Sequence, residues 1–401
     1  MHQLHKTRAM TAIAAIAVLV TACSSSAATT APTVAPSVAA SVAPSVAPSV
    51  AASVAPSVAA SASAAAKTYT IGYSNGGGVG NGFREEQMCT AKAQALVSGE
   101  VSKLTLISRN TDAAGQLQDL RDLIAAGVNA IVVNPNDADA LSPAIDEAKA
   151  KGIVVVSVDA YVNNAYAYNL YNNQINYAYL GAKWLFTQMN GTGSVYYMRG
   201  LAGHPADNDR DIGFKKALAE FPNIKVLPNA DGVATGWDPA KGTELINNFI
   251  ASGDYDKIQG IWTSGIDSQV VDAIKAANKK QVPIVGADLG AFVNQLLNTS
   301  GGYAGLQGAA VTNTAGVGGA GVALALKLLD KQTVTTDPSA SKPNTVLLVP
   351  VVADNVSDAG KTLLQSWLVK GLDPNWPLGL KIDGWTTYTA EQAIACKGPG
   401  E

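Results

Sequence analysis

Polar and aromatic side chains follow several apolar runs of the sequence at the point where each run ends. Asp159 comes directly after residues 153–158, Asn134 after 130–133 and Asp288 after 283–287. Carboxylates, amides and guanidinium groups can hydrogen-bond paired hydroxyls and ring oxygens, and aromatic faces can cover apolar C–H patches. This mixture is what a small sugar requires. The positions of this kind are Asn81, Phe83, Arg84, Asn134, Asp159, Arg210, Trp237, Asp267 and Asp288.

Each of these positions also has a structural explanation. Asp159 can cap a helix, and Asn134 before a proline is common turn chemistry. Either arginine can pair with a nearby carboxylate on its own helix, and Phe83 or Trp237 can be an ordinary core aromatic. Spacing alone does not separate these alternatives.

The elements that must position these side chains alternate between strand and helix. Continuous β-branched runs predict strands buried on both faces, as in a parallel sheet, and amphipathic stretches between them predict helices. The first half has predicted strands at 69–74, 104–108, 130–133 and 153–158, with helices at 83–97, 113–126 and 138–151. The second half has strands at 194–198, 224–227, 260–263 and 283–287, with helices at 209–220, 238–251 and 269–278. Ligands of open α/β sheets bind beyond the carboxyl ends of the strands, so a cleft between two α/β halves is expected.

Composition argues against several other classes. The chain has 28 Lys and Arg against 31 Asp and Glu, so no basic surface points to nucleic acid. The glycines at 76–80 do not fit a dinucleotide fingerprint. No His or Cys cluster has metal-ligand spacing, and no cofactor is indicated. Only His204 lies beyond the first five residues, which leaves a Ser-His-Asp triad little support. Pairs of Asp and Glu exist, so composition does not exclude a glycosidase, but the sequence shows no barrel pattern of eight βα units. No enzyme is therefore expected.

The first 66 residues are predicted to lie outside the folded part. Residues 1–22 have a basic start and a short apolar run, as in a secretory signal. Val20-Thr21-Ala22-Cys23 resembles the lipobox of bacterial lipoproteins, in which the cysteine is acylated; the alternative is an ordinary cleaved signal. Residues 23–66 are built mainly from Ala, Ser, Val, Pro and Thr and predict a disordered stalk. The expected location is extracytoplasmic, with a lipid anchor to the membrane at Cys23.

The sequence contains three cysteines. If Cys23 carries lipid, Cys89 and Cys396 remain as one possible pair in an oxidising compartment. A disulfide between them would tie the first predicted helix to the C-terminal tail. The alternative is two separate buried thiols.

Several motifs, taken in order, resemble the type I periplasmic binding proteins of the ribose and galactofuranose type. The resemblance spans about residues 69 to 360. It is carried by Tyr69-Thr-Ile-Gly-Tyr-Ser74, Asn81-Gly-Phe-Arg84, Leu123 to Pro135, Gly152 to Asp159, Gly200-Leu-Ala-Gly203 with Asp209-Arg210 and Gly213-Phe214, and Val285-Gly-Ala-Asp288.

The resemblance implies two α/β lobes, each a parallel sheet flanked by helices, joined by a three-segment hinge near residues 171–173, 312–314 and 349–354. Lobe 1 would comprise 67–171 and 313–350. Lobe 2 would comprise 172–312 and 351–401, including the C-terminal tail. Asn313 would sit at the hinge, the candidate residues up to Asp159 would line one wall of the cleft, and those from Arg210 to Asp288 the other.

The function implied is capture of a monosaccharide or related polyol and its delivery to an ABC permease, by a monomer. Ribose binders carry arginine directly after the aspartate of the fourth strand, whereas Ala160 follows Asp159 here. The arginine that they use in the second lobe aligns with Asn208 rather than Arg210. A differently shaped pentose, hexose or polyol is therefore expected. The alternative function is a sensor that passes a sugar or furanose signal to a receptor.

Overall fold

The computed structural model describes residues 68–77 and 80–401. The predicted signal at 1–22, the predicted stalk at 23–66 and the predicted lipidation site Cys23 lie outside the described residues. Within the described part of the chain, no helix has both the length and the apolar character needed to cross a membrane.

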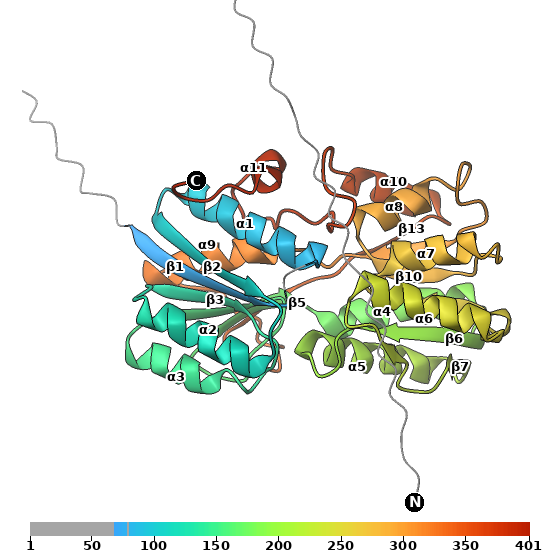
Figure 1. Ribbon diagram of the computed structural model, residues 1–401, viewed down its shortest axis with the longest axis horizontal. Coiled ribbons are helices and arrows are strands. Elements are labelled where there is room, and N and C mark those ends of the chain that lie inside the picture. Colours follow the sequence, from blue (N-terminus) through green and yellow to red (C-terminus); the bar gives the residue numbers. More distant parts are fainter. Residues whose placement is uncertain (1–67, 78–79) are drawn as a thin grey trace, which may run out of the picture. The chain divides into compact units, whose positions relative to one another are not determined.

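The first half of the described chain, together with β12 from its C-terminal part, builds a six-stranded parallel sheet in the order β12-β5-β4-β3-β1-β2 (Figure 1). We call this sheet and its helices lobe 1. Its strands are β1 (Tyr69–Gly76), β2 (Val101–Arg109), β3 (Ala130–Asn134), β4 (Val154–Val158), β5 (Tyr168–Asn172) and β12 (Thr345–Leu348). Its helices are α1 (Gly82–Ser98), α2 (Ala113–Ala125), α3 (Ser142–Ala150) and α9 (Val317–Leu329).

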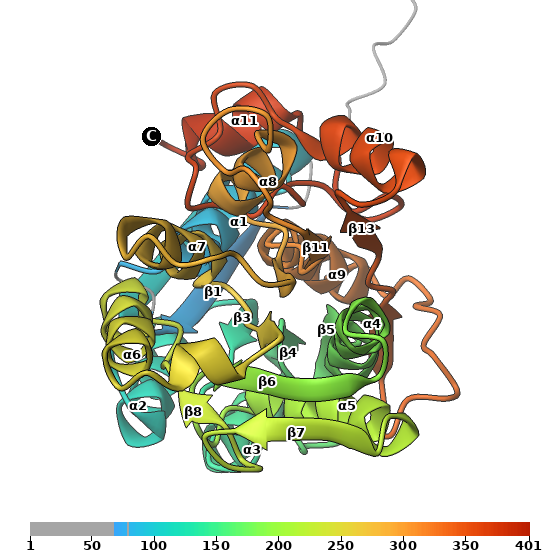
Figure 2. The same cartoon turned by 90° about the vertical axis from the view of Figure 1, so that its right-hand side faces the viewer.

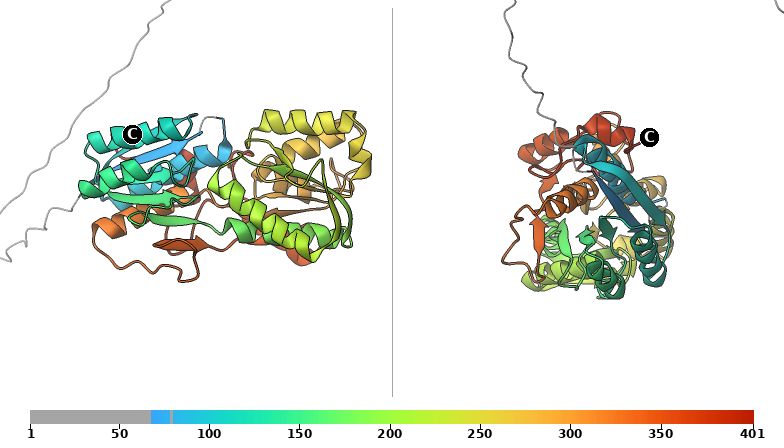
Figure 3. Two further views of the ribbon diagram at one scale, coloured as in Figure 1. Left: turned by 90° about the horizontal axis from the view of Figure 1, so that it is seen from below. Right: turned by 90° about the vertical axis from the view of Figure 1, so that its left-hand side faces the viewer.

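Both faces of this sheet are buried, as the β-branched runs predict. Along β3, Ala130 and Val132 pack against α1 and α9, whereas Ile131 and Val133 pack against α2 and α3. This alternation follows from the two-residue period of a strand. Figure 3 shows α2, in teal, and α9, in orange, on opposite sides of the sheet.

The second half builds a sheet in the order β13-β11-β10-β9-β6-β7, with β8 paired to β6, which we call lobe 2 with its helices. Only β13, which pairs with β11, is antiparallel to its neighbour. The strands are β6 (Thr192–Arg199), β7 (Asn223–Leu227), β8 (Val233–Ala234), β9 (Gly260–Trp262), β10 (Ile284–Ala287), β11 (Gly308–Val311) and β13 (Val352–Asp354).

Helices cover both faces of the second sheet as well. The core under α4 and α5 contains the aromatic stack of Tyr197 on Phe214, with ring centroids 3.8 Å apart. The opposite core lies under α6, α7, α8 and α10. Figure 2 shows α4 and α6 on opposite sides of β6. These helices are α4 (Gln174–Gln188), α5 (Pro205–Glu220), α6 (Pro239–Ala251), α7 (Asp267–Ala276), α8 (Gly290–Leu297) and α10 (Asp358–Trp367), and a 3₁₀ turn spans Asp254–Lys257. The two-lobed α/β fold predicted from the sequence is confirmed.

The chain passes between the two sheets after β5, after β11 and after β12. It returns once more after α10, because α11 (Ala390–Ala395) packs on α1 of lobe 1. Leu380, Tyr388 and Ala393 are buried there against Ala93. The expected assignment of 351–401 to lobe 2 therefore needs correction from residue 380 onward. The physical reason is the apolar face of α11, which finds its partner on α1.

A disulfide joins Cys89 on α1 to Cys396 just after α11. It closes a loop of 307 residues and fixes the C-terminal tail on lobe 1. Gln94 and Thr387 add hydrogen bonds between the same two segments, including Thr387 N to Gln94 Oε1 at 2.9 Å. The C-terminus is thus part of lobe 1 although it follows a lobe 2 helix.

Candidate functional site

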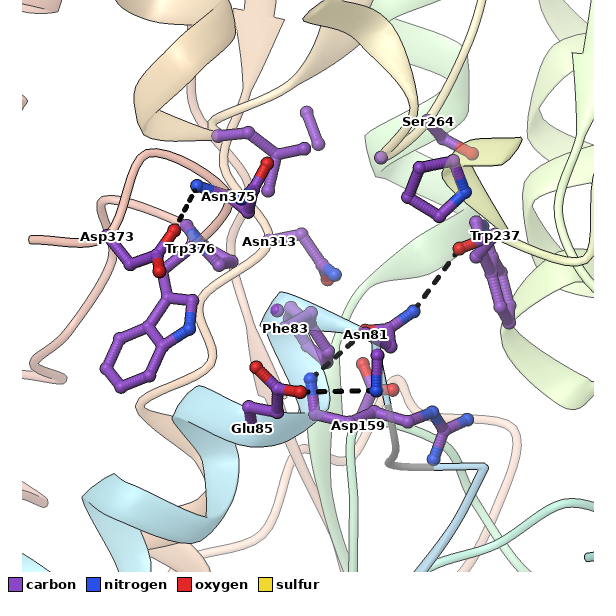
Figure 4. A pocket seen from close by; sticks show the side chains of 18 of the residues that line it. Asn81, Phe83, Glu85, Asp159, Trp237, Ser264, Asn313, Asp373, Asn375 and Trp376 are labelled. Atoms are coloured by element: carbon purple, nitrogen blue, oxygen red, sulfur yellow. Dashed lines mark hydrogen bonds between the residues drawn. The ribbon is translucent and has the colours of Figure 1, made fainter. Parts of the chain in front are cut away.

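A cavity of about 310 Å³ lies between the two lobes at the carboxyl ends of their strands. Side chains from both lobes line it, as Figure 4 shows. The sequence-predicted residues that line this cavity are Asn81, Phe83, Arg84, Asp159, Arg210, Trp237 and Asn313. The other three predicted ligand residues, Asn134, Asp267 and Asp288, are buried but do not line it.

Asp159 provides the carboxylate of the cavity. It follows β4 directly and its backbone takes the left-handed conformation, with φ of 65°. Its Oδ2 accepts from Asn134 Nδ2 at 3.2 Å, and its buried Oδ1 has no hydrogen-bond partner within the protein. Burial raises the pKa of Asp159, while the positive charges of Arg84 and Arg210 oppose that shift. A strained backbone and an unpartnered carboxylate oxygen are features that proteins retain at binding sites.

Asn134 lies behind Asp159. Its amide nitrogen donates to Gln87 Oε1 at 2.9 Å as well as to Asp159. The residue was predicted to contact ligand, but the structure places it as a support that orients the carboxylate. Asn134 precedes Pro135, the pattern of turn chemistry. Its side chain is nevertheless held by Gln87 and Asp159 of lobe 1.

Arg84 brings a positive charge to the first turn of α1. Its Nη1 donates to Asn75 Oδ1 at 2.9 Å, and Asn75 Nδ2 donates back to the Arg84 carbonyl at 2.9 Å. Asn75 therefore fixes both the guanidinium and the backbone of Arg84, of which only 4% is exposed. Asn81 is the N-cap of the same helix, since its Oδ1 accepts from Arg84 N at 3.1 Å. Asn81 Nδ2 also donates across to the Trp237 carbonyl of lobe 2 at 3.4 Å.

His204 meets Arg84 from lobe 2. Its Nε2 lies 3.2 Å from Arg84 Nη2, and its Nδ1 lies 3.2 Å from the backbone N–H of Ala206. Burial and the two nearby arginines lower the pKa of His204 well below its usual value, so the ring is neutral. A neutral imidazole can accept at only one nitrogen. The ring therefore cannot accept from both Arg84 Nη2 and Ala206 N, and one of these two donors lacks an acceptor on His204. An oxygen atom of a ligand in the adjoining cavity can serve as the acceptor for Arg84.

Arg210 and Trp237 form the lobe 2 wall. Arg210 Nε donates to Gln174 Oε1 at 2.8 Å, and its guanidinium carbon lies 4.3 Å from the Tyr177 ring centroid and 5.6 Å from that of Trp237. Trp237 takes a left-handed φ of 55° just before α6. Its Nε1 is buried without a hydrogen-bond partner in the protein. The wall thus combines a fixed cation with an aromatic plane.

Asn313 lies where the chain leaves lobe 2 for α9. Its Oδ1 accepts from Asn172 Nδ2 at 2.6 Å and from Gln174 Nε2 at 3.0 Å. Both donors lie at the first passage between the lobes, next to the end of β5. Asn313 therefore couples two of the inter-lobe passages and also borders the cavity.

Asp267 was predicted as a ligand group, and this prediction needs correction. It is the first residue of α7, and its carboxylate accepts from Gly265 N at 3.1 Å, from Ala287 N at 2.9 Å and from the Thr263 hydroxyl. These bonds fasten α7 to β10 and leave the carboxylate inside lobe 2. The role is structural.

Asp288 also lies behind the wall rather than in it. Its Oδ1 accepts from Asn313 N at 2.9 Å, whereas its neighbours Ala287 and Leu289 are the residues that border the cavity. Its Oδ2 is buried without a partner in the protein. The end of β10 was correctly predicted to lie at the site. The residues of this strand end that border the cavity are Ala287 and Leu289 rather than Asp288.

The structure adds lining residues that were not among the predicted ligand residues. Glu85, Ser264 and Gln269 lie next to predicted positions and could have been found by extending each strand-end window. Asp373, Asn375 and Trp376 belong to the segment after α10, which follows no predicted strand. No pattern in the sequence connects that segment with the cleft.

Unpartnered buried polar atoms of both kinds gather around the cavity. Asp159 Oδ1 is an acceptor, Trp237 Nε1 is a donor and Ser264 Oγ can be either. Buried groups of this kind are usually satisfied in a folded protein, so a ligand rich in hydroxyl groups fits them. Among the described residues, no group of three or more His, Cys, Asp and Glu side chains could hold a metal ion.

The buried carboxyls of lobe 2 give the stability of the protein a defined pH dependence. Burial raises the pKa of Asp267 and of Asp288 from 3.8 to about 6. Between these values the folded protein binds more protons than the unfolded chain, so these groups make the free energy of unfolding fall as the pH rises from about 4 to about 6. We expect that in Asp267→Asn the free energy of unfolding falls less steeply with pH over this range, by up to about 1.4 kcal/mol per pH unit. Urea unfolding at several pH values measures it.

The matched control is Asp256→Asn, which removes an exposed carboxylate paired with Lys279 at 2.8 Å. This control should leave the fall in stability between about pH 4 and about pH 6 as it is in the unaltered protein. Equal profiles for the unaltered protein and Asp267→Asn would contradict the raised pKa of Asp267.

Comparison with protein families and curated proteins places this chain among periplasmic binding proteins. The model of the periplasmic binding protein domain matches residues 71–333. A xylitol-binding protein of Mycolicibacterium smegmatis is 30% identical over 260 residues, which are 63% of this chain and 69% of that protein. The galactofuranose-binding protein of Escherichia coli is 29% identical over 51% of this chain and 64% of its own length. The ribose import binding protein of Bacillus subtilis is 25% identical over 46% of this chain and 59% of its own.

Solved structures with the same fold are more distant in sequence. A solute-binding protein of an ABC transporter from Thermobispora bispora superposes with a TM-score of 0.66 at 22% identity, covering 77% of this chain and 90% of its own. The fructose-binding periplasmic domain of a hybrid two-component system gives 0.62 at 20% identity, covering 74% of this chain and 94% of its own.

Proposed function

Because the chain belongs to the periplasmic binding protein family, we propose that it captures a small sugar or polyol between its two lobes and delivers it to an ABC importer. The observation that carries this proposal is the cavity between the lobes, in which a carboxylate, two arginines and an indole converge. The relatives that bind xylitol, ribose and galactofuranose support the ligand class. These relatives are binding proteins, and catalysis is not part of the proposal.

Each cavity group has a role in this proposal. Asp159 Oδ1 accepts from a hydroxyl group of the sugar, and Arg84 and Arg210 donate to hydroxyl or ring oxygens. The Trp237 indole covers an apolar C–H patch of the sugar. A hydrogen bond to a charged group contributes about 1.5–3 kcal/mol, so several together can hold a strongly hydrated ligand.

Closure of the two lobes completes the proposed site. Arg84 of lobe 1 meets His204 of lobe 2, and Asn81 donates to the Trp237 carbonyl, so contacts between the lobes run beside the cavity. A sugar that bonds to Asp159 and Arg210 at once favours the arrangement in which these lobes are together, and binding shifts the population toward it. Bending at the passages near residues 171–173, 312–314 and 349–354 would open the cleft.

The same proposal includes the surroundings in which the protein works. A lipid on Cys23 would hold the domain at the outer face of the membrane, and residues 23–66 would act as the stalk. A monomer with a closed cleft would then be the form that the permease recognises. Ala160 in place of the arginine of ribose binders favours a sugar or polyol other than ribose.

A thermal-shift screen of the purified protein tests the proposed function. The panel contains xylitol, D-ribose, other pentoses, hexoses, nucleosides and amino acids. A ligand that binds only the folded protein at a hundredfold excess over Kd adds about 2.7 kcal/mol to the free energy of unfolding. A large shift with one sugar or polyol is expected. A shift with amino acids or nucleosides alone would overturn the ligand class.

Gly200 provides a test of the aromatic wall that leaves every lining side chain unchanged. A Cβ at Gly200 would lie 2.0 Å from the Trp237 indole, so Gly200→Ala must displace the ring. Overpacking costs about 1–3 kcal/mol, and we expect affinity for the sugar identified in the screen to fall by about 5- to 100-fold. Calorimetric titration measures it, with Gly302→Ala, at an exposed loop glycine, as the control. Unchanged affinity in Gly200→Ala would show that the indole does not contact sugar.

A sensor is the second candidate function, because the fructose-binding domain of a hybrid two-component system has the same fold. In that case a receptor rather than a permease would read the closed lobes. The genes next to that of this protein distinguish the two, since permease and ATPase genes favour import. A pull-down of the membrane partner by the sugar-loaded protein gives the direct answer.

A further inference from the structure

A segment outside the matched family region forms one side of the cavity. After α10 the chain runs through residues 369–379, which we call the C-terminal strap, and Asp373, Asn375, Trp376 and Pro377 of this strap line the cavity. Figure 4 shows Asp373, Asn375 and Trp376 on the side of the pocket opposite Trp237 and Ser264. The site therefore has a third wall besides the strand ends of the two lobes.

The strap is fastened to lobe 2 through its backbone. The carbonyls of Pro374 and Trp376 accept from Ala291 N at 2.6 Å and from Gly290 N at 2.9 Å. These N–H groups belong to the first turn of α8, which has no side-chain cap, so the strap satisfies donors that the helix itself cannot. Leu378 N donates to the Asp288 carbonyl at 2.9 Å, directly beside the site.

Lobe 1 meets the strap at two places. At Gly82, on the first turn of α1, a Cβ would lie 2.3 Å from the Asn375 carbonyl oxygen and 3.1 Å from Trp376 Cδ1. At Gly379, the strap carbonyl accepts from Gly316 N at 3.2 Å and from the Thr314 hydroxyl, where the chain leaves lobe 2 for α9. Beyond this point Leu380 is buried on α1 and the Cys89–Cys396 disulfide closes the tail.

These anchors define how the strap can move. Leu378 is bonded to lobe 2 and Leu380 packs on lobe 1, and two residues span at most about 7 Å. Gly379 lies between these two anchors, and its carbonyl accepts from the hydroxyl of Thr314, the residue after Asn313. Residues 373–377, which are bonded to α8, must move with lobe 2. Their contact with Gly82 must then form and break as the lobes close and open.

We propose that the C-terminal strap is a ligand-contacting latch: residues 373–377 close with lobe 2 onto Gly82 and over the bound sugar, and the disulfide-fixed tail holds a fourth hinge segment at Gly379. This inference rests on the proposed function for the identity of the ligand. Its mechanical part, the anchored strap, has a readout that needs no sugar.

Gly82→Ala is the variant that tests the latch. The added methyl meets the strap backbone only when the lobes are together, whereas alanine on the first turn of α1 favours the helix more than glycine does. Affinity for the panel member that binds the unaltered protein is expected to fall by about 5- to 100-fold, with faster dissociation and an unchanged Tm of the ligand-free protein. Gly302→Ala should bind as the unaltered protein does. Unchanged affinity in Gly82→Ala would overturn the latch.

Hydrogen exchange at Gly290 and Ala291 tests the anchor without any sugar. Their amides donate to the strap, so Cys396→Ser, which frees the tail, should speed their exchange relative to the unaltered protein. Lys92→Ala, which removes only the exposed contact of Lys92 with Glu401, is the control and should change nothing at these amides. Equal exchange in Cys396→Ser would overturn the anchored strap. Failure of every panel compound to bind the unaltered protein would instead refute the proposed function, while the exchange result still decides the anchor.

Discussion

Replacing Asp159 with asparagine is expected to weaken sugar binding by about 10- to 100-fold while the protein stays folded, because the hydrogen bonds lost are those of a charged acceptor. The substitution keeps the shape of the side chain and tolerates the left-handed backbone, which asparagine adopts more readily than most residues. It removes the negative charge that interacts with Arg84 of lobe 1 and Arg210 of lobe 2. Calorimetric titration with the sugar identified in the screen measures the change.

Asp256→Asn is the matched control for this prediction. It makes the same chemical change at an exposed position of lobe 2, where the carboxylate pairs with Lys279. The control should bind as tightly as the unaltered protein, and both variants should keep its circular dichroism. Full affinity in Asp159→Asn would remove Asp159 from the site and with it the principal acceptor of the proposed mechanism.

The second large effect concerns stability. Replacing Cys89 and Cys396 together by serine is expected to lower the free energy of unfolding by about 2–4 kcal/mol, because the unfolded chain is no longer constrained by a cross-link. The loop that this disulfide closes, 307 residues, is among the longest that the chain allows. Urea unfolding of the double variant and of the unaltered protein measures the difference.

Two further measurements isolate the contribution of the cross-link. Reduction of the unaltered protein with a phosphine should reproduce the loss, whereas Lys92→Ala, which keeps the disulfide, should produce a much smaller one. A double variant as stable as the oxidised protein would show that packing of α11 on α1 alone holds the tail. The disulfide would then have no part in fixing the strap.

Much of the fold was predictable because the strands are buried on both faces. The run Val154–Val158 is broken only by Ser157, and Ala130–Asn134 is apolar up to its last residue, which identifies a parallel sheet and the edge at which its ligand binds. The family predicted from the order of the motifs is confirmed by the family model, which matches residues 71–333. β5, by contrast, reads Tyr-Asn-Leu-Tyr-Asn and has no apolar run. Asn169 accepts from Val162 N of the preceding loop, and Asn172 donates to Asn313 at another passage between the lobes.

The site was predictable only where a side chain points into the cleft. Asp159 and Asp267 both follow a buried strand and look alike in the sequence. Asp159 leaves one oxygen free, whereas Asp267 bonds back to the N–H groups of its own turn and of β10. That choice depends on the direction of the backbone after each strand, which composition and spacing do not specify.

The C-terminal strap shows the other limit of the sequence. Its place beside the cavity depends on carbonyls that cap α8 and on a glycine at residue 82 that admits it. Every residue type carries a backbone carbonyl, so contacts of this kind cannot be recognised from the sequence. Gly82 also precedes the strap by almost the whole length of the domain. Such a contact can be found only in three dimensions.

A fluorescence titration tests the central claim most directly, because Trp237 lies in the wall of the cavity. Adding xylitol, D-ribose and the other panel sugars to the purified protein should give a saturable change of tryptophan emission with one of them. The same sugar should give no saturable change at those concentrations with Asp159→Asn. Absence of saturation with every sugar, or an unaltered titration in Asp159→Asn, would contradict capture of a sugar at this site.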